Sequence, residues 1–270
     1  MTQTSAADQG QAELQRLYIL LVDIFRGGLA GTLAGVLFLG AGGRIVMRIS
    51  ALLNPDARGF LTESENVVGE ITLGGTVALV VVGGAIFGLA AGTVWVLVRE
   101  WLPREITART SLAAILAAVT GSAGVIAADN SDFRVLEPQE AHVAMFLLLL
   151  LLTGAATALI DRALESRLPA SALPAGLFGG LAGVGLVFAI PALAFFYFLN
   201  PDTERPPVAA GIALCVLAIP TIAGWTRYYA TGADISTTRP VWERYLGRAA
   251  LLLFAAIAAL YLAAEVEAIV

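Results

Sequence analysis

The chain of 270 residues contains no lysine, one cysteine (Cys215) and one histidine (His142). Because a Schiff base needs a lysine amine, the absence of lysine excludes retinal-type and other Schiff-base chemistry. One cysteine and one histidine cannot form an intrachain disulfide, a standard structural zinc site or bis-histidine haem ligation. We therefore expect neither a bound metal nor a cofactor.

Charged residues are also scarce, at 14%, whereas 58% of residues are hydrophobic and the mean hydropathy is +0.82. Soluble domains carry about 25% charged residues. The charges cluster and leave apolar runs of ~20 residues, which cross ~30 Å of hydrocarbon as helices. Strand-like alternation is absent, so helices must satisfy the backbone in lipid. The composition predicts an all-α integral membrane protein.

Residues 1–13 form a polar tail without a basic segment, so we expect no cleaved signal peptide. Residues 14–270 form one membrane domain. Near the beginning of this domain, Asp23 and Arg26 are three residues apart, a spacing at which they can form an ion pair on a helix. Apolar runs and charged boundaries predict a bundle of seven transmembrane helices, at about 24–53, 68–98, 110–128, 141–160, 174–199, 207–226 and 247–268.

The arginines divide unequally between the two sides of this bundle. With seven spans, eleven of the sixteen arginines fall on the side of the N-terminus and five on the other. The positive-inside rule then predicts a multi-pass protein of the cell membrane with a cytoplasmic N-terminus and an extracytoplasmic C-terminus.

Glycines recur at four-residue spacing in three of the predicted helices. Small residues at this spacing let two helix backbones approach closely. We expect helix packing at Gly27, Gly31, Gly35, Gly84, Gly88, Gly92, Gly176 and Gly180.

The outer turns after the first, third and fifth helices begin alike, at Asn54, Asn130 and Asn200. This near-constant period predicts three tandem helical hairpins plus a seventh helix. Two other interpretations remain open. In the first, each Asn caps its own helix independently and there is no repeat. In the second, the repeat consists of helices one to three and helices five to seven, with the fourth helix as a linker.

The same outer turns are acidic, with Asp56, Glu63, Glu65, Glu70, Asp132 and Asp202. Such a cluster would concentrate cations at a pore mouth. Topology alone also depletes outer loops of arginine, so the acidity by itself does not require a pore.

Arg44 and Arg48 lie one turn apart near the outer end of the first helix. Two guanidinium groups on one face are suited to an anionic headgroup, a phosphate or a carboxylate. The alternative is that both reach the interface or pair with an outer glutamate.

The central turns of the second to sixth helices contain no Asp, Glu, Arg or His. Their polar groups are mainly hydroxyls, such as those of Thr120 and Thr157. Proton-coupled transport and intramembrane proteolysis both need ionisable groups or ligand clusters there. An enzyme is therefore disfavoured.

Three functional hypotheses follow. The favoured one is a channel or facilitative transporter for a small solute, with an acidic extracytoplasmic vestibule. The second is an accessory subunit whose glycine faces bind a membrane-protein partner or another copy of the chain. The third is a lipid- or anion-binding protein using Arg44 and Arg48. All three place the chain in a lipid bilayer, and none involves nucleic acid.

Overall fold

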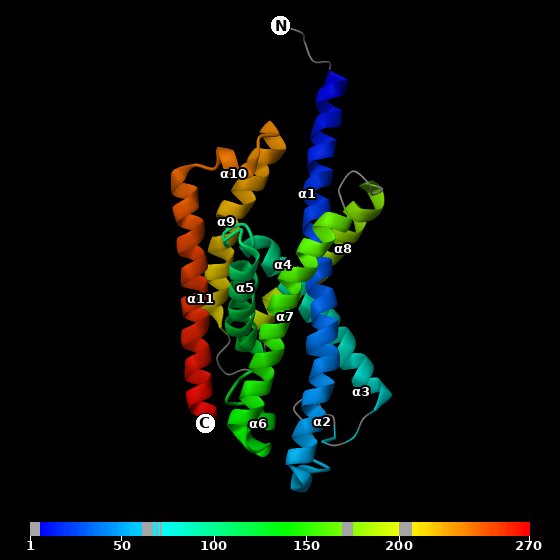
Figure 1. The fold of residues 1–270 in the computed structure, drawn as a ribbon, viewed down its shortest axis with the longest axis vertical. Coiled ribbons are helices and arrows are strands. Elements are labelled where there is room, and N and C mark those ends of the chain that lie inside the picture. Colours follow the sequence, from blue (N-terminus) through cyan, green and yellow to red (C-terminus); the bar gives the residue numbers. More distant parts are fainter. Residues whose placement is uncertain (1–5, 61–66, 69, 71, 169–174, 200–206) are drawn as a thin grey trace.

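The structure is a computed structural model that describes residues 6–60, 67, 68, 70, 72–168, 175–199 and 207–270. The regular structure of these residues is helical, as predicted (Figure 1). Beyond short helical turns, the elements are α1 (Ala6–Gly35), η1 (Val36–Gly42), α2 (Gly43–Leu53), α3 (Leu73–Ala78), η3 (Leu79–Ile86), α4 (Phe87–Val98), α5 (Ile106–Gly121), α6 (Ser131–Val135), α7 (Gln139–Arg167), α8 (Ala175–Ala194), η6 (Phe195–Leu199), α9 (Val208–Thr231), α10 (Ile235–Thr238) and α11 (Val241–Ile269).

Six helices of the described residues are long and apolar enough to cross a membrane. They are Gly10–Leu53, Leu73–Val98, Gln139–Arg167, Gly179–Leu199, Val208–Thr231 and Val241–Ile269. The predicted span 110–128 corresponds to α5, which has 16 residues and is about 24 Å long. Because α5 is shorter than the hydrocarbon layer, the count of seven spans stays a prediction.

Some helix ends differ from the predicted ones for local reasons. The second span begins at Leu73 and not at residue 68, because the Thr72 hydroxyl caps the helix by accepting from the Gly75 N–H at 3.1 Å. The fourth continues to Arg167 and not to 160, because Asp161 is paired inside the bundle and does not end the helix.

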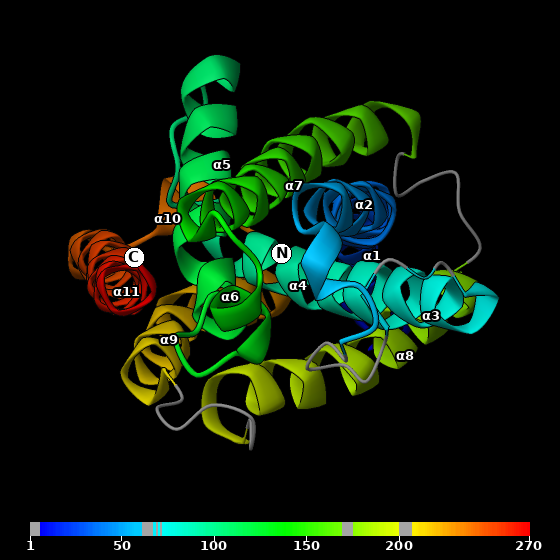
Figure 2. The same cartoon turned by 90° about the horizontal axis from the view of Figure 1, so that it is seen from below.

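Helix α4 crosses the centre of the bundle, with α5 and α7 on one side and α8 and α9 on the other (Figure 2). It packs most extensively against α1. The two helices touch through glycines: a Cβ on Gly88 would lie 2.5 Å from the Gly31 carbonyl oxygen, and one on Gly92 would lie 2.5 Å from that of Gly27. The close approach of the two backbones therefore depends on the missing side chains.

A second contact region joins α4, α9, α11 and η6 around buried apolar side chains. Phe254 and Leu217 are fully buried there, beside Trp101 and Tyr197.

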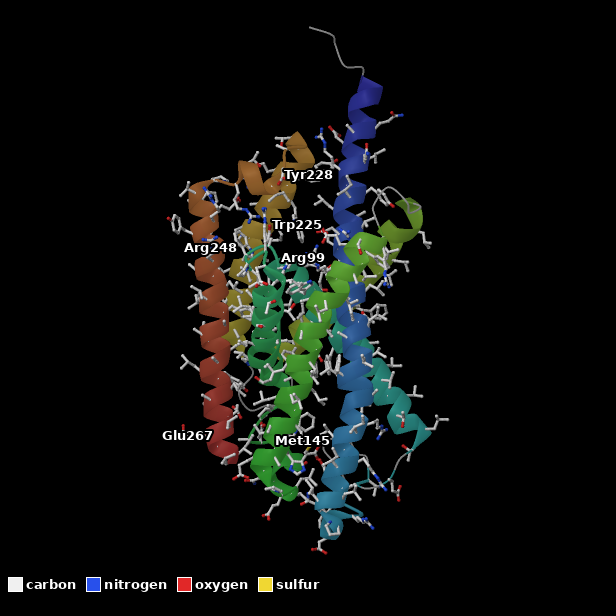
Figure 3. The ribbon with its side chains drawn as sticks, viewed as in Figure 1. Arg99, Met145, Trp225, Tyr228, Arg248 and Glu267 are labelled. Atoms are coloured by element: carbon white, nitrogen blue, oxygen red, sulfur yellow. The ribbon has the colours of Figure 1, made fainter. Side chains whose placement is uncertain are left out.

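Figure 3 places Arg99 in the upper half of the molecule, where α4 ends, and Glu267 at the opposite end. The ion pairs of Asp161 and Glu100 lie near Arg99, in this upper half of the molecule.

Candidate functional site

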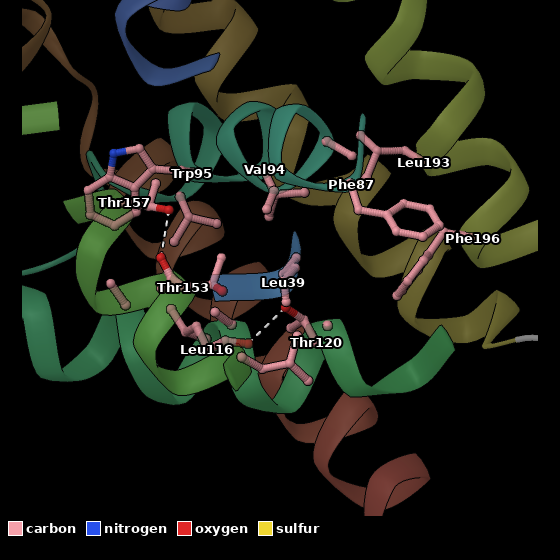
Figure 4. A pocket seen from close by; sticks show the side chains of 18 of the residues that line it. Leu39, Phe87, Val94, Trp95, Leu116, Thr120, Thr153, Thr157, Leu193 and Phe196 are labelled. Atoms are coloured by element: carbon pink, nitrogen blue, oxygen red, sulfur yellow. Dashed lines mark hydrogen bonds between the residues drawn. The ribbon is translucent and has the colours of Figure 1, made fainter. Parts of the chain in front are cut away.

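A cavity of about 120 Å³ lies between α4, α5, α7 and the α8–η6 segment. Its walls are apolar apart from a few hydroxyl groups. Val94 comes from α4, Leu116 from α5 and Leu193 from α8 (Figure 4). Its position between helices within the bundle is typical of ligand sites.

Three threonine hydroxyls border the cavity, but each one donates to its own helix. Thr120 donates to the Leu116 carbonyl at 2.8 Å, Thr153 to that of Leu149 at 2.7 Å, and Thr157 to that of Thr153 at 2.8 Å. Back-bonding of this kind leaves no hydroxyl proton for a ligand. The cavity is therefore suited to apolar contact rather than to a polar solute.

Aromatic rings close one end of the cavity. Phe196 contacts Phe87 edge-to-face, with ring centroids 6.2 Å apart, and also contacts the neighbouring Tyr197 at 5.1 Å. Tyr197 is buried against Phe254 and donates its hydroxyl to the Thr120 carbonyl at 3.4 Å. This wall has large apolar faces, with its one hydroxyl engaged by the backbone.

Trp95 closes the other end and links the cavity to an ionic cluster. Its indole N–H donates to Asp161 at 2.9 Å, and Arg99 donates to both oxygens of the same carboxylate. Arg99 also pairs with Asp23, which pairs with Arg26 at 2.8 Å. The Asp23–Arg26 pair confirms the spacing prediction, while its extension to Arg99 and Asp161 was not predicted.

This cluster joins α1, the end of α4 and α7. Desolvation by burial opposes the charge of Arg99, but Asp23 and Asp161 outweigh it and raise the pKa of Arg99. Arg109 donates to the Arg99 carbonyl at 3.0 Å and stacks over Trp95. With one arginine and two carboxylates in close contact, the three helices are held together where they leave the apolar region.

A second ionic cluster starts at the next residue. Glu100 pairs with Arg239, and the fully buried Glu243 accepts from Arg227 at 2.5 and 2.8 Å. Arg239 also lies over the ring of Trp101, 4.1 Å from its centroid. Residues 99–101 thus connect α4 to α1 and α7 on one side and to α9 and α11 on the other.

The arginines predicted to bind an anion lie elsewhere. Arg44 is half-buried, has an Nε atom without a partner and makes a 3.9 Å contact to the Met47 sulfur. Arg48 is exposed, and neither arginine has a carboxylate partner among the described residues. Anion binding at this pair remains a prediction.

The predicted acidic vestibule is only partly within the described residues. Asp56 and Glu70 are exposed and Asp132 is half-buried, whereas Glu63, Glu65 and Asp202 lie outside the described part of the chain. The vestibule stays a prediction.

The turn asparagines have different local roles. Asn54 donates to the Ser50 carbonyl at 3.0 Å and accepts from the Glu137 N–H at 2.7 Å, which ties two outer turns together. Asn130 caps α6 by accepting from the Asp132 N–H at 2.8 Å. Asn200 is outside the described residues, and the tandem-hairpin hypothesis remains untested.

The glycines of α8 differ from those of α1 and α4. A Cβ on Gly176 or Gly180 would meet no atom within 4 Å. Among the described residues, no other part of the chain packs against these two positions. In contrast, a Cβ on Gly35 would overlap the backbone of Gly84.

No family model, curated protein or solved structure matches the chain. Among the described residues no group of three His, Cys, Asp or Glu side chains could hold a metal ion. The fold therefore defines the class: an all-helical bundle of membrane-spanning length and composition, as in polytopic membrane proteins.

Sequence reasoning found part of this site. The sequence indicated Thr120 and Thr157 as polar groups inside the bundle. The predicted spans ended at residues 98 and 160, directly before Arg99 and Asp161, so the ion pair between these two residues was not foreseen. A usable signal existed for Asp161, because a carboxylate directly after 18 uncharged residues must find a partner at the membrane boundary.

Proposed function

We propose that the chain binds the hydrocarbon part of a lipid, or an apolar molecule of similar size, in the central cavity. The observation that carries the proposal is the combination of apolar walls with hydroxyls that donate to their own helices. A dry cavity of ~150 Å³ accommodates benzene, so about 120 Å³ accommodates a short stretch of an acyl chain.

This proposal replaces the transporter hypothesis as the better supported one. A facilitative path for a small polar solute needs donors and acceptors directed at the solute. The cavity presents engaged hydroxyls and the rings of Phe87 and Phe196. Binding an apolar group needs no such donors, because it needs only shape and the absence of water.

Filling the cavity tests the proposal. Ala91 lines it and is half-buried, so Ala91→Leu would occupy the space with a larger apolar side chain. We expect protein purified in mild detergent to retain less lipid when it carries Ala91→Leu, as measured by native mass spectrometry. Ala78→Leu, on the exposed face of α3, should retain lipid like the wild type. Equal retention in both variants contradicts the proposal.

A second candidate function is that of an accessory subunit, favoured by the open glycine row of α8. Gly176, Gly180 and Gly183 have free space where a Cβ would lie, and Leu177 and Val184 beside them are exposed. A partner helix could approach this face closely.

Crosslinking tests the accessory-subunit hypothesis. With Cys215→Ala as background, Gly180→Cys should crosslink to a partner chain in native membranes. Leu252→Cys on the exposed face of α11 serves as the control. Adducts at both positions or at neither would remove this hypothesis.

A further inference from the structure

A second cleft, of about 500 Å³, lies where α5 begins and α7 ends. Ile106 and Arg109 line it from α5, and Leu159, Arg162 and Glu165 line it from α7. Ala158, which lines this cleft, packs against Trp95 and Ala113, which line the central cavity. Its size falls in the range of small-ligand sites, ~300–1,000 Å³.

The cleft lies at the level where the hydrocarbon layer ends. Residues 143–160 of α7 contain no charged side chain, and these 18 residues extend about 27 Å along the helix axis, close to the ~30 Å of a bilayer core. The first charges after this stretch are Asp161 and Arg162, so the cleft lies at headgroup depth.

Asp161 and Glu165 attract Arg109 across the cleft, but neither carboxylate forms a close ion pair with an arginine of the cleft lining. Asp161 is engaged by Arg99 and Trp95. Among the described residues neither Arg109 nor Arg162 forms an ion pair.

Arg109 in particular is fixed in place but not neutralised. It donates to the Arg99 carbonyl and stacks on Trp95, and its Nε atom is buried without a hydrogen-bond partner. Arg109 and Arg162 line the cleft together with Glu165 and Asp161, and because Arg99 already pairs with Asp161, an excess of one positive charge remains. A single negative charge would balance it.

We propose that this cleft binds the phosphodiester of an anionic membrane phospholipid. Arg109 and Arg162 donate to the phosphate oxygens, which guanidinium groups match in geometry and charge. Ile106 and Leu159 supply apolar surface at the start of the acyl chains. Basic pockets between membrane helices bind lipid headgroups in this way. The proposal does not depend on a ligand in the central cavity.

The test uses the full chain in detergent with short-chain lipids as probes. Binding of dihexanoyl phosphatidylglycerol, dihexanoyl phosphatidylcholine and inorganic phosphate is measured by calorimetric titration on the wild type, Arg162→Gln and Arg167→Gln. Arg167 is exposed on the same helix but does not line the cleft, so its variant is the matched control. Arg109→Gln is a further variant, with its unfolding temperature measured because Arg109 also packs on Trp95.

We expect phosphatidylglycerol to bind more tightly than phosphatidylcholine, and Arg162→Gln to weaken it about tenfold, the usual effect of losing one charge-assisted hydrogen bond. Arg167→Gln should bind like the wild type. An equal loss in both variants, or none in Arg162→Gln, overturns the site. If inorganic phosphate binds as tightly as the lipid and with the same dependence on Arg162, the assignment to a lipid is overturned.

Discussion

Arg99 donates hydrogen bonds at 2.8 and 2.9 Å to the two carboxylate oxygens of Asp161, which lies 62 residues further along the chain. The side chains are 11% and 10% exposed, so water screens the pair little. Because Asp161 also accepts from Trp95, the pair links the charged end of the bundle to the wall of the central cavity.

Replacing Asp161 by Asn should destabilise the bundle by about 3 kcal/mol, because a buried cation then loses one of its two anionic partners. The free energy of unfolding in mixed micelles, followed by circular dichroism, measures this. Asp56→Asn, at an exposed outer position, is the control and should change stability by less than about 0.5 kcal/mol. A similar loss in both variants would show that the pair has no special role.

A methyl group on Gly31 should disturb the α1–α4 contact. The added Cβ would overlap the Gly88 carbonyl and the Gly92 backbone, so the helices must separate. We expect Gly31→Ala to cost about 1–3 kcal/mol. Gly180→Ala adds the same atom in open space and should be neutral or slightly stabilising. Thermal unfolding of the two variants in one detergent compares them, and equal unfolding temperatures contradict the contact.

Trp101 occupies the space that Gly247 leaves open. A Cβ on Gly247 would overlap the Trp101 ring, whose indole N–H donates to Thr221 at 3.0 Å. Gly247→Ala should therefore destabilise the chain by about 1–3 kcal/mol. Its cost should be smaller in a Trp101→Leu background, where the ring is gone. A double-mutant cycle on unfolding free energies measures this coupling, and purely additive effects would exclude it.

Glu100 should make stability depend on pH. Burial raises the pKa of Glu100, although Arg239 pairs with it and opposes the rise. A carboxyl whose folded pKa is raised contributes stability below its unfolded pKa of ~4.3 and loses that contribution as pH rises through the folded pKa. Glu100→Gln should therefore show a weaker decline in unfolding temperature from pH 4 upward than the wild type. An unchanged profile would falsify this assignment.

The predicted orientation can be measured by cysteine labelling. Asp56 and Ala230 lie at opposite ends of the bundle, near α2 and at the end of α9 (Figure 1). In a Cys215→Ala background, a membrane-impermeant thiol reagent on intact cells should label Asp56→Cys but not Ala230→Cys. Labelling of both from the outside would contradict the topology.

Local patterns predicted much of the fold, because they depend on neighbours along one helix. The apolar runs predicted membrane-length helices, and the Asp23–Arg26 spacing predicted an ion pair that the structure contains. Helix ends were less predictable. Asp161 follows an uncharged run and was expected to lie beyond the helix end, because its partner Arg99 is 62 residues away and no local pattern identifies that pair.

The sequence by itself determined that the chain forms long apolar helices of membrane-spanning length, because an uncharged run of ~20 residues has no other stable solution in a bilayer. Only the tertiary structure decided which glycines meet another backbone, that the threonine hydroxyls leave the cavity apolar, and that Arg109 and Arg162 share one cleft. The glycine contacts and the shared cleft join helices that are far apart in the sequence, such as α1 with α4 and α5 with α7. Their crossing is set by packing and not by local pattern.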